Sequence, residues 1–315
     1  MNPVDLLDEL RSVASIAGIS ALGVTDAQPF AEARRVIESQ KSDGLHGGMH
    51  FTYGRPERST DPALIVPGAA SIIVGLWAYG RDHAAPSHSP PAGRVARYVH
   101  TDAYGGLSTA LGRVADRLRV EGHSAEVVLD DNRLVDRSAA YRAGLGWLGH
   151  NTNLLHPTLG SWLVIGSVVT SAELPVSEAP VSDGCGSCRR CAAQCPTGAL
   201  DDPGVLDARK CLAWLVQAGG SFPREFRSAL GDRIYGCDDC QEVCPVNPGL
   251  DAASAVRVEL KPRAPWVPLV DMLAASDEEL LATFGHWYIP RRRAQYLRRN
   301  ALVALGNVAT LMTLR

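Results

Sequence analysis

Apolar residues recur at helical spacing close to the start of the chain. The positions on this face are Val4, Leu7, Leu10, Ala14 and Ala17. Asn2 can cap such a helix, and Pro3 suits its first turn because a proline there loses no helical hydrogen bond. The pattern therefore predicts a helix over residues 2–17.

Helical and strand-like segments then alternate. The predicted helices cover residues 31–40, 107–121 and 137–143, and the predicted strands cover residues 19–24, 70–79, 125–129 and 162–170. Residues 70–79 form a continuous apolar run with β-branched side chains, which is typical of a strand buried on both faces. Such alternation predicts an α/β domain over residues 1–172 with a mixed, partly parallel sheet.

Irregular segments divide the pattern. Residues 42–62, rich in Gly, His, Arg and aromatic side chains, form a long segment of the kind that usually has a function. Residues 84–93, rich in Pro, Ser and His, indicate a surface loop. Prolines in residues 173–183 suggest a hinge. The predicted domains are residues 1–172, 173–250 and 251–315.

The tail after residue 251 is predicted to be helical. Ser276 and Glu279 have the spacing of a capping box, which starts a helix before Leu280. A last helix is expected from about Arg291 to Thr310.

Composition places the chain among ordinary globular proteins, with 46% hydrophobic and 21% charged residues. No apolar run reaches the ~20 residues of a membrane span. The acidic, amphipathic first residues do not resemble a signal peptide, so we expect a cytoplasmic protein without membrane contact. The net charge of −3 gives no overall indication of a nucleic-acid partner.

The strongest chemical signal is a cysteine motif at residues 185–196. Cys185, Cys188, Cys191 and Cys195, with Pro196, have the spacing C-x2-C-x2-C-x3-C-P of bacterial ferredoxins. In that motif three thiolates bind one [4Fe–4S] cluster and the fourth binds a second cluster.

A second, incomplete copy follows at Cys237, Cys240 and Cys244, where Ile234 stands at the place of a first cysteine. Cys211 is the remaining cysteine and the obvious substitute. Crossing the fourth ligands as ferredoxins do assigns all eight cysteines. The first cluster is predicted on Cys185, Cys188, Cys191 and Cys244, and the second on Cys195, Cys211, Cys237 and Cys240.

Two other uses of the cysteines deserve comparison with this one. Structural zinc sites of cysteine alone usually come as two separated C-x2-C pairs, which this run does not match. Disulfides need an oxidising compartment, and nothing in the sequence suggests export.

Clusters transfer electrons but transform few substrates alone, so the α/β domain is expected to hold the reaction site. It contains neither a G-x-G-x-x-G that opens a helix nor a P-loop. Asp130 ends a predicted strand, where α/β folds gather ligands, and a buried carboxyl there could donate a proton. The alternative is that Asp130 or Asp131 caps a turn.

Basic residues gather at the C-terminal end, and residues 280–315 contain no Asp or Glu. The arginines proposed to contact RNA are Arg291, Arg292, Arg293, Arg298 and Arg299. Aromatic side chains between them suit phosphate contact with base stacking. The alternative is a helix whose arginines are merely solvated. The nine histidines are scattered, with His150 beside Asn151 the one worth keeping.

Together these features resemble the epoxyqueuosine reductase family over roughly residues 45–310. The resemblance is carried by residues 55–62, Arg97-Tyr98, Asp130 with Asp136-Arg137, residues 143–152, both cysteine loops with Cys211, and residues 297–307. It implies a reductase that converts epoxyqueuosine to queuosine in the anticodon region of tRNA, with base-off cobalamin and two [4Fe–4S] clusters. It also implies an external electron donor and a short helical, HEAT-like tail.

The same resemblance implies roles for individual residues. Asp130 matches the family's proton donor. Arg55, Tyr98, Asn151, Cys237 and Asp238 match positions near the cobalamin. The chain departs from the family's pattern at Ala103, Gly105, His150 and Asp136.

Two other functions remain open at this point. One is a related cobalamin and iron–sulfur reductase, of the reductive-dehalogenase kind, that acts on a free small molecule. The other is an electron-transfer protein of the ferredoxin type with no substrate of its own.

Overall fold

The computed structural model describes residues 2–79, 91–177, 181–247 and 260–313. Its largest element is a four-stranded sheet in the order β1 (Ala21–Asp26), β2 (Ser71–Ala78), β7 (Leu163–Thr170) and β4 (Ala125–Leu129). Every neighbouring pair in this sheet is antiparallel. The prediction of a partly parallel sheet within residues 1–172 is therefore wrong. A continuous apolar strand indicates that both faces of the sheet are buried. Helices bury both faces here although no two neighbouring strands of the sheet are parallel.

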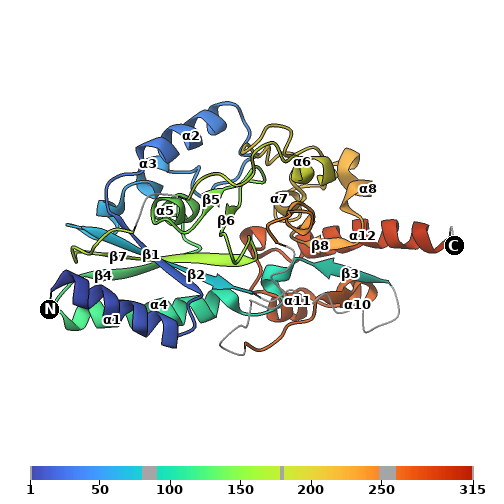
Figure 1. The fold of residues 1–315 in the computed structure, drawn as a ribbon. Coiled ribbons are helices and arrows are strands. Elements are labelled where there is room, and N and C mark those ends of the chain that lie inside the picture. Colours follow the sequence, from blue (N-terminus) through green and yellow to red (C-terminus); the bar gives the residue numbers. More distant parts are fainter. Residues whose placement is uncertain (1, 80–90, 178–180, 248–259, 314–315) are drawn as a thin grey trace.

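Helices cover both faces of this sheet and make three layers (Figure 1). Helices α1 (Pro3–Ile16) and α4 (Ala103–Val120) pack on one face, around Leu10, Leu107 and Leu111. Helices α2 (Ala31–Ser42) and α5 (Asp136–Arg142) pack on the other, and α3 (Pro56–Ser59) lies near α2. All eight residues of β2 are buried, as its apolar run predicts.

A second, mixed sheet joins distant parts of the chain. Its strands are β8 (Arg233–Tyr235), β3 (Ala92–Val95) and β9 (Trp266–Pro268), with β3 in the centre. Strand β3 pairs parallel with β8 and antiparallel with β9. Residues 92–93 were expected in a surface loop, and that end of the prediction is wrong because both are buried in this sheet. Residues 84–90 of the same loop lie outside the described residues.

The C-terminal part is mostly helical. It contains α10 (Leu269–Ala274), α11 (Asp277–Phe284) and α12 (Gln295–Thr313), which pack against the mixed sheet around Val267, Leu269 and Leu297. The expected capping box of Ser276 and Glu279 is present at α11. The expectation of helix from residue 251 onward is corrected by β9, and residues 251–259 are outside the described part.

Short elements connected by loops build residues 181–247. The helices are α6 (Arg190–Gln194), α7 (Leu212–Leu215), α8 (Arg227–Leu230) and α9 (Asp239–Glu242). A small hairpin of β5 (Trp147–Leu148) and β6 (Leu154–Leu155) precedes them in the chain. The boundaries of the three predicted domains stay a prediction.

Several elements agree with the sequence patterns. The carboxamide oxygen of Asn2 accepts hydrogen bonds from the backbone N–H groups of Val4 and Asp5, which confirms it as the cap of α1.

Three-residue 3₁₀ turns lie at Pro62–Leu64, Arg97–Val99, Arg224–Phe226 and Pro290–Arg292. No helix in the described ranges has the length and apolar character needed to cross a bilayer.

Candidate functional site: two groups of thiols beside a carboxylate

One group of thiols comes from both cysteine loops. Cys185, Cys188 and Cys191 lie on the first loop, and Cys244 from the second loop packs in the same small core as Cys185. Burial raises the pKa of the Cys191 and Cys244 thiols, and the other thiols of the group raise it further. Four thiols thus lie close together, in the combination that the sequence predicted for the first cluster.

The other group contains Cys195, Cys211, Cys237 and Cys240. Burial, with a smaller contribution from the Asp239 carboxylate, raises the pKa of Cys237 to about 12. Burial also raises the pKa of Cys211, which has Cys195 near it, and of Cys240, which has Cys237 and Cys211 near it. Since iron binds thiolates, loading either group must release protons. The chemistry of both donor sets fits a [4Fe–4S] cluster.

The two groups lie next to each other, because Cys191 of the first group is among the thiols that raise the pKa of Cys240. In the described parts of the chain, no three His, Cys, Asp or Glu side chains converge on the position of a single metal ion.

The hairpin of β5 and β6 contacts both cysteine loops. The indole Nε1–H of Trp147 donates to Cys185 Sγ at 3.5 Å. In the turn of the hairpin, Nδ1 of His150 lies 2.9 Å from the carbonyl oxygen of Cys188. The carboxamide Nδ2 of the buried Asn151 donates to the carbonyl oxygen of Cys240 at 3.5 Å. Asn151 therefore lies against the second group of thiols.

Asp238 is a buried carboxylate beside that second group. Its Oδ2 accepts a hydrogen bond of 2.8 Å from the backbone N–H of Arg97, and burial raises its pKa to about 6. The guanidinium carbon of Arg97 lies 4.5 Å from the centre of the Trp162 ring. These contacts connect the second cysteine loop to the end of the large sheet.

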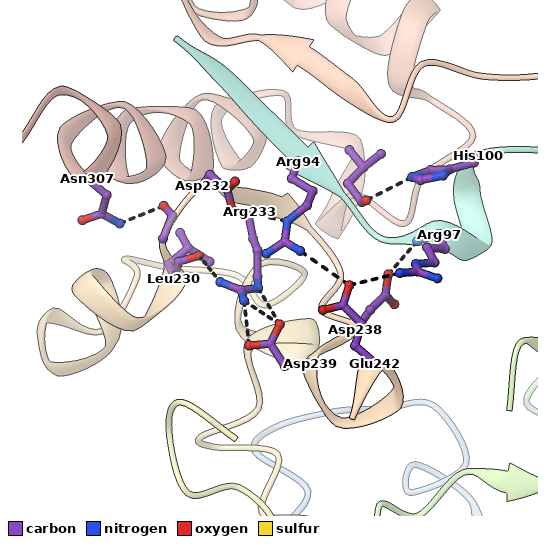
Figure 2. Close-up of polar contacts among 12 residues, drawn as sticks. Arg94, Arg97, His100, Leu230, Asp232, Arg233, Asp238, Asp239, Glu242 and Asn307 are labelled. Atoms are coloured by element: carbon purple, nitrogen blue, oxygen red, sulfur yellow. Dashed lines mark hydrogen bonds and ion pairs between the residues drawn. The ribbon is translucent and has the colours of Figure 1, made fainter. Parts of the chain in front are cut away.

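Ion pairs fix the same loop from its other side (Figure 2). The guanidinium of Arg233 donates to both carboxylate oxygens of Asp239, at 2.5 and 2.6 Å, and to the carbonyl oxygen of Leu230 at 3.0 Å. Arg94 lies within 3.4 Å of Asp232 and 3.7 Å of Glu242. The loop is thus held by buried and half-buried charge pairs, for which the cysteine spacing gave no signal.

Asp130 follows β4 with φ of 48°, a left-handed conformation that Asp tolerates better than most residues. Its neighbour Asp131 makes the turn contacts, because its carboxylate accepts from Arg133 N at 2.9 Å and from Arg133 Nε at 2.7 Å. No hydrogen bond to the carboxylate of Asp130 occurs within the described residues. The side chain is exposed, yet surrounding protein raises its pKa, and Asp131 raises it further.

Polar side chains from other segments surround Asp130. Burial raises the pKa of Tyr104 above its usual range, and Asp130 and Asp136 raise it further. Between ring centres, Tyr98 lies 6.2 Å from Tyr235 and 6.5 Å from Tyr104. Oδ1 of Asp136 is buried and has no partner in the described part of the chain.

Sequence reasoning did not assign site roles to Tyr104, Asp136 or Tyr235. Tyr235 stands two residues before Cys237, which was the available signal. Tyr104 and Asp136 come from helix starts, and a single sequence does not reveal that they meet.

Arg55 is exposed at the start of α3, and no side-chain contact of it is found among the described residues. Its helix is tied to the Asp130 turn, since Ser59 Oγ donates to the carbonyl oxygen of Asn132 at 2.5 Å. Arg55 thus belongs to a segment that lies against the Asp130 turn.

The C-terminal arginines divide into two kinds. Arg299 donates to the backbone carbonyls of Leu215, Val216, Ala218 and Gly220 at 2.7–3.1 Å. Arg298 binds Asp277 and the carbonyl oxygen of Ala275, and Arg292 binds the carbonyl oxygen of Gly285. Arg291 and Arg293 are exposed, and within the described ranges neither forms a side-chain hydrogen bond or an ion pair with a carboxylate. The structure thus gives three of the five arginines contacts within the chain.

Comparison with known proteins supports this description. Residues 184–247 match the family model of the 4Fe-4S double cluster binding domain. The chain is 33% identical to the epoxyqueuosine reductase of Bacillus cereus, covering 96% of this chain and 80% of that protein. It is 31% identical to the epoxyqueuosine reductase of Xanthomonas campestris, covering 97% and 88%.

Solved structures agree. An epoxyqueuosine reductase crystallised with a tRNA-Tyr epoxyqueuosine-modified stem loop matches with a TM-score of 0.89 and 32% identity, covering 97% of this chain and 82% of that one. A reductive dehalogenase bound to 3-bromo-4-hydroxybenzoic acid matches with a TM-score of 0.52 and 17% identity, which shows a shared fold alone.

The fold and the two groups of thiols beside a carboxylate define an iron–sulfur oxidoreductase. Relatives about one-third identical over nearly the whole chain narrow the class further. The chain belongs to the epoxyqueuosine reductase family.

Proposed function

We propose that this chain reduces epoxyqueuosine to queuosine in the anticodon region of tRNA, with two [4Fe–4S] clusters and base-off cobalamin. The observation that carries the proposal is the likeness over 97% of the chain to an epoxyqueuosine reductase solved with a modified tRNA stem loop. A dehalogenase-like activity on a free small molecule has weaker support, because that likeness concerns the fold alone. An external donor would supply electrons to the clusters, and tRNA as substrate favours the cytoplasm.

The first cluster is proposed on Cys185, Cys188, Cys191 and Cys244, and the second on Cys195, Cys211, Cys237 and Cys240. The neighbouring thiols that raise one another's pKa support this division. The second group lies beside Asp238 and Tyr235, so it is proposed to pass electrons to the reaction site.

Cobalamin, when bound, would supply a low-valent cobalt for two-electron reduction. The residues near Asp130 fit a polar ligand, because the buried Oδ1 of Asp136 has no partner within the described residues. Tyr98, Asn151, Asp238 and Cys237 are proposed to line one side of this ligand. Arg55 is proposed to contact it from α3.

Asp130 is proposed as the proton donor. Two electrons and two protons convert the epoxide to an alkene and release its oxygen as water, and Asp130 would protonate that oxygen as the ring opens. Surrounding protein raises the pKa of Asp130, which favours the protonated acid that this step needs. A Bacillus subtilis epoxyqueuosine reductase is described with an aspartate-bearing catalytic loop swung out of the active site.

An Asp130→Asn enzyme tests this role. Conversion of epoxyqueuosine in tRNA, followed by mass spectrometry of the nucleosides, should slow by about 10²–10⁴-fold, the usual contribution of a general acid. Asp131→Asn is the matched control, because its carboxamide oxygen can still accept the turn hydrogen bond from the backbone N–H of Arg133, and it should keep most of the activity.

An Asp130→Asn rate equal to wild type would remove Asp130 from the proposal. Wild-type protein with both clusters and cobalamin that forms no queuosine from epoxyqueuosine-containing tRNA would contradict the function itself.

A further inference from the structure

The indole of Trp147 meets the first group of thiols through its N–H edge. Its Nε1–H donates to Cys185 Sγ at 3.5 Å, which is a hydrogen-bond distance for sulfur. The ring is only 7% exposed and packs in one small core with Leu155 and Cys244. Trp147 therefore packs with two of the four thiols that would bind the first cluster.

The surrounding backbone is shaped to hold the ring there. Trp147 pairs with Leu155 across the β5–β6 hairpin, which fixes its direction. On the facing loop, a Cβ at Gly184 would lie 2.7 Å from the indole ring, so a larger residue would displace it. The β5–β6 hairpin on one side and the loop at Gly184 on the other thus hold the Trp147 ring against Cys185.

The second group of thiols has different hydrogen-bond partners. Cys195 Sγ accepts from the backbone N–H of Ala199 at 3.3 Å and lies 3.6 Å from the hydroxyl of Thr197. Hydrogen bonds to cluster sulfurs stabilise the more negative, reduced state and raise the reduction potential. Among the described contacts, Trp147 is the side-chain N–H donor to a thiol of the first group.

We propose that Trp147 is a positioning residue that raises the reduction potential of the first cluster through its N–H···Sγ hydrogen bond to Cys185. The proposal rests on the cluster assignment of the proposed function and on no property of the tRNA substrate. This hydrogen bond makes the first cluster a better electron acceptor than it would be with its four thiolate ligands alone. The hairpin that presents Trp147 also presents Asn151 to the second group, so one element touches both.

The test is a redox titration of the reconstituted full-length protein, without tRNA, followed by electron paramagnetic resonance. In Trp147→Phe an aromatic ring remains and the N–H is lost. At fixed potential the ratio of reduced to oxidised first cluster should fall about tenfold, which is a downward shift of ~59 mV for a one-electron couple. The midpoint that moves should be the one that is altered in a Cys188→Ser protein.

Trp214→Phe is the matched control. Trp214 Nε1–H donates to the carbonyl oxygen of Gly47 at 2.9 Å, not to sulfur, so its loss should leave the first midpoint in place. Replacement of Trp147 by 3-benzothienylalanine, which keeps the bicyclic shape and lacks the N–H, gives the same measurement should phenylalanine impair cluster binding.

An unchanged first midpoint in either Trp147 variant, with full iron and sulfide content, would overturn the proposal. A lowered first midpoint in Trp147→Phe, together with a wild-type protein that holds both clusters but does not convert epoxyqueuosine, would leave Trp147's role intact and contradict the proposed function alone.

Discussion

Two neighbouring aspartates after β4 have separate tasks. Asp131 accepts the turn hydrogen bonds from Arg133, and Asp130 adopts a positive φ with its carboxylate unbonded in the described residues. A backbone conformation of this kind is costly and is often found at functional sites. From sequence alone both roles could be given to either residue, because the spacing does not reveal which carboxylate makes the turn contacts.

Asp136 provides a prediction on pH. Burial raises the pKa of Asp136 well above its ordinary value, and Asp130 raises it further. The folded state then binds this proton more tightly than the unfolded state does. The resulting stability is fully present below the unfolded pKa and is lost as pH rises through the folded pKa.

Asp136→Asn should therefore stabilise the protein at neutral pH, because the neutral amide has no buried charge to desolvate. The advantage should shrink toward pH 4. Thermal unfolding of variant and wild type across this range measures it. An Asp136→Asn protein that gains nothing at pH 8 would show that this carboxyl is not desolvated in solution.

At the scale of elements, the sequence patterns predicted correctly those features that depend on residues close together in the chain. The cap of α1, the capping box of α11 and the buried β2 follow from residues close in sequence. Strand direction in the large sheet did not follow, since apolar periodicity carries no information on pairing. The same limit applies to the site: the cysteines are recognisable by spacing, whereas Tyr104 and Tyr235 meet only through the fold.

Helix α7 carries another prediction, because it starts directly after Cys211 and its C-terminal carbonyls are bound by Arg299. Arg299→Ala leaves the carbonyl oxygens of Leu215 and Ala218 without this donor, each costing about 1–3 kcal/mol, whereas that of Val216 keeps a donor from Asn300. We expect a marked loss of thermal stability and of iron from the second cluster. Iron and sulfide assays with thermal unfolding measure both effects.

Arg293→Ala is the matched control on the same part of the chain, and its melting temperature should stay near wild type, since exposed substitutions cost within ~0.5 kcal/mol. Equal iron content in Arg299→Ala and wild type would mean that α7 needs no such support.

At the scale of the whole molecule, the mixed sheet joins three distant parts of the chain. Strand β3 stands between β8, which precedes the second cysteine loop, and β9, which opens the C-terminal helices. The exposed Arg291 and Arg293 lie between α11 and α12, far in sequence from Arg55. An RNA that contacted Arg55 as well as Arg291 and Arg293 would therefore extend from the N-terminal part of the chain to its C-terminal helices.

Binding of tRNA tests this arrangement. The double variant Arg291→Ala with Arg293→Ala should weaken tRNA binding at low salt. It should also reduce the slope of log affinity against log salt by about 1–2, because fewer counterions are released from the RNA when fewer phosphates are contacted. Affinity measured from about 50 to 200 mM salt checks it. Arg298→Ala, whose side chain binds Asp277, should keep the wild-type slope, and an unchanged slope in the double variant would exclude these two arginines from the RNA surface.

The interleaving of the two cysteine loops has a consequence for biosynthesis. Under the proposed assignment of the cysteines, the second set of sulfurs is complete once the ribosome has passed Cys240, whereas the first set, though it begins at Cys185, waits for Cys244. If iron is delivered during translation, the ligands of the second cluster would thus be available before those of the first. The clusters would then assemble in the reverse of the order in which their first cysteines are synthesised.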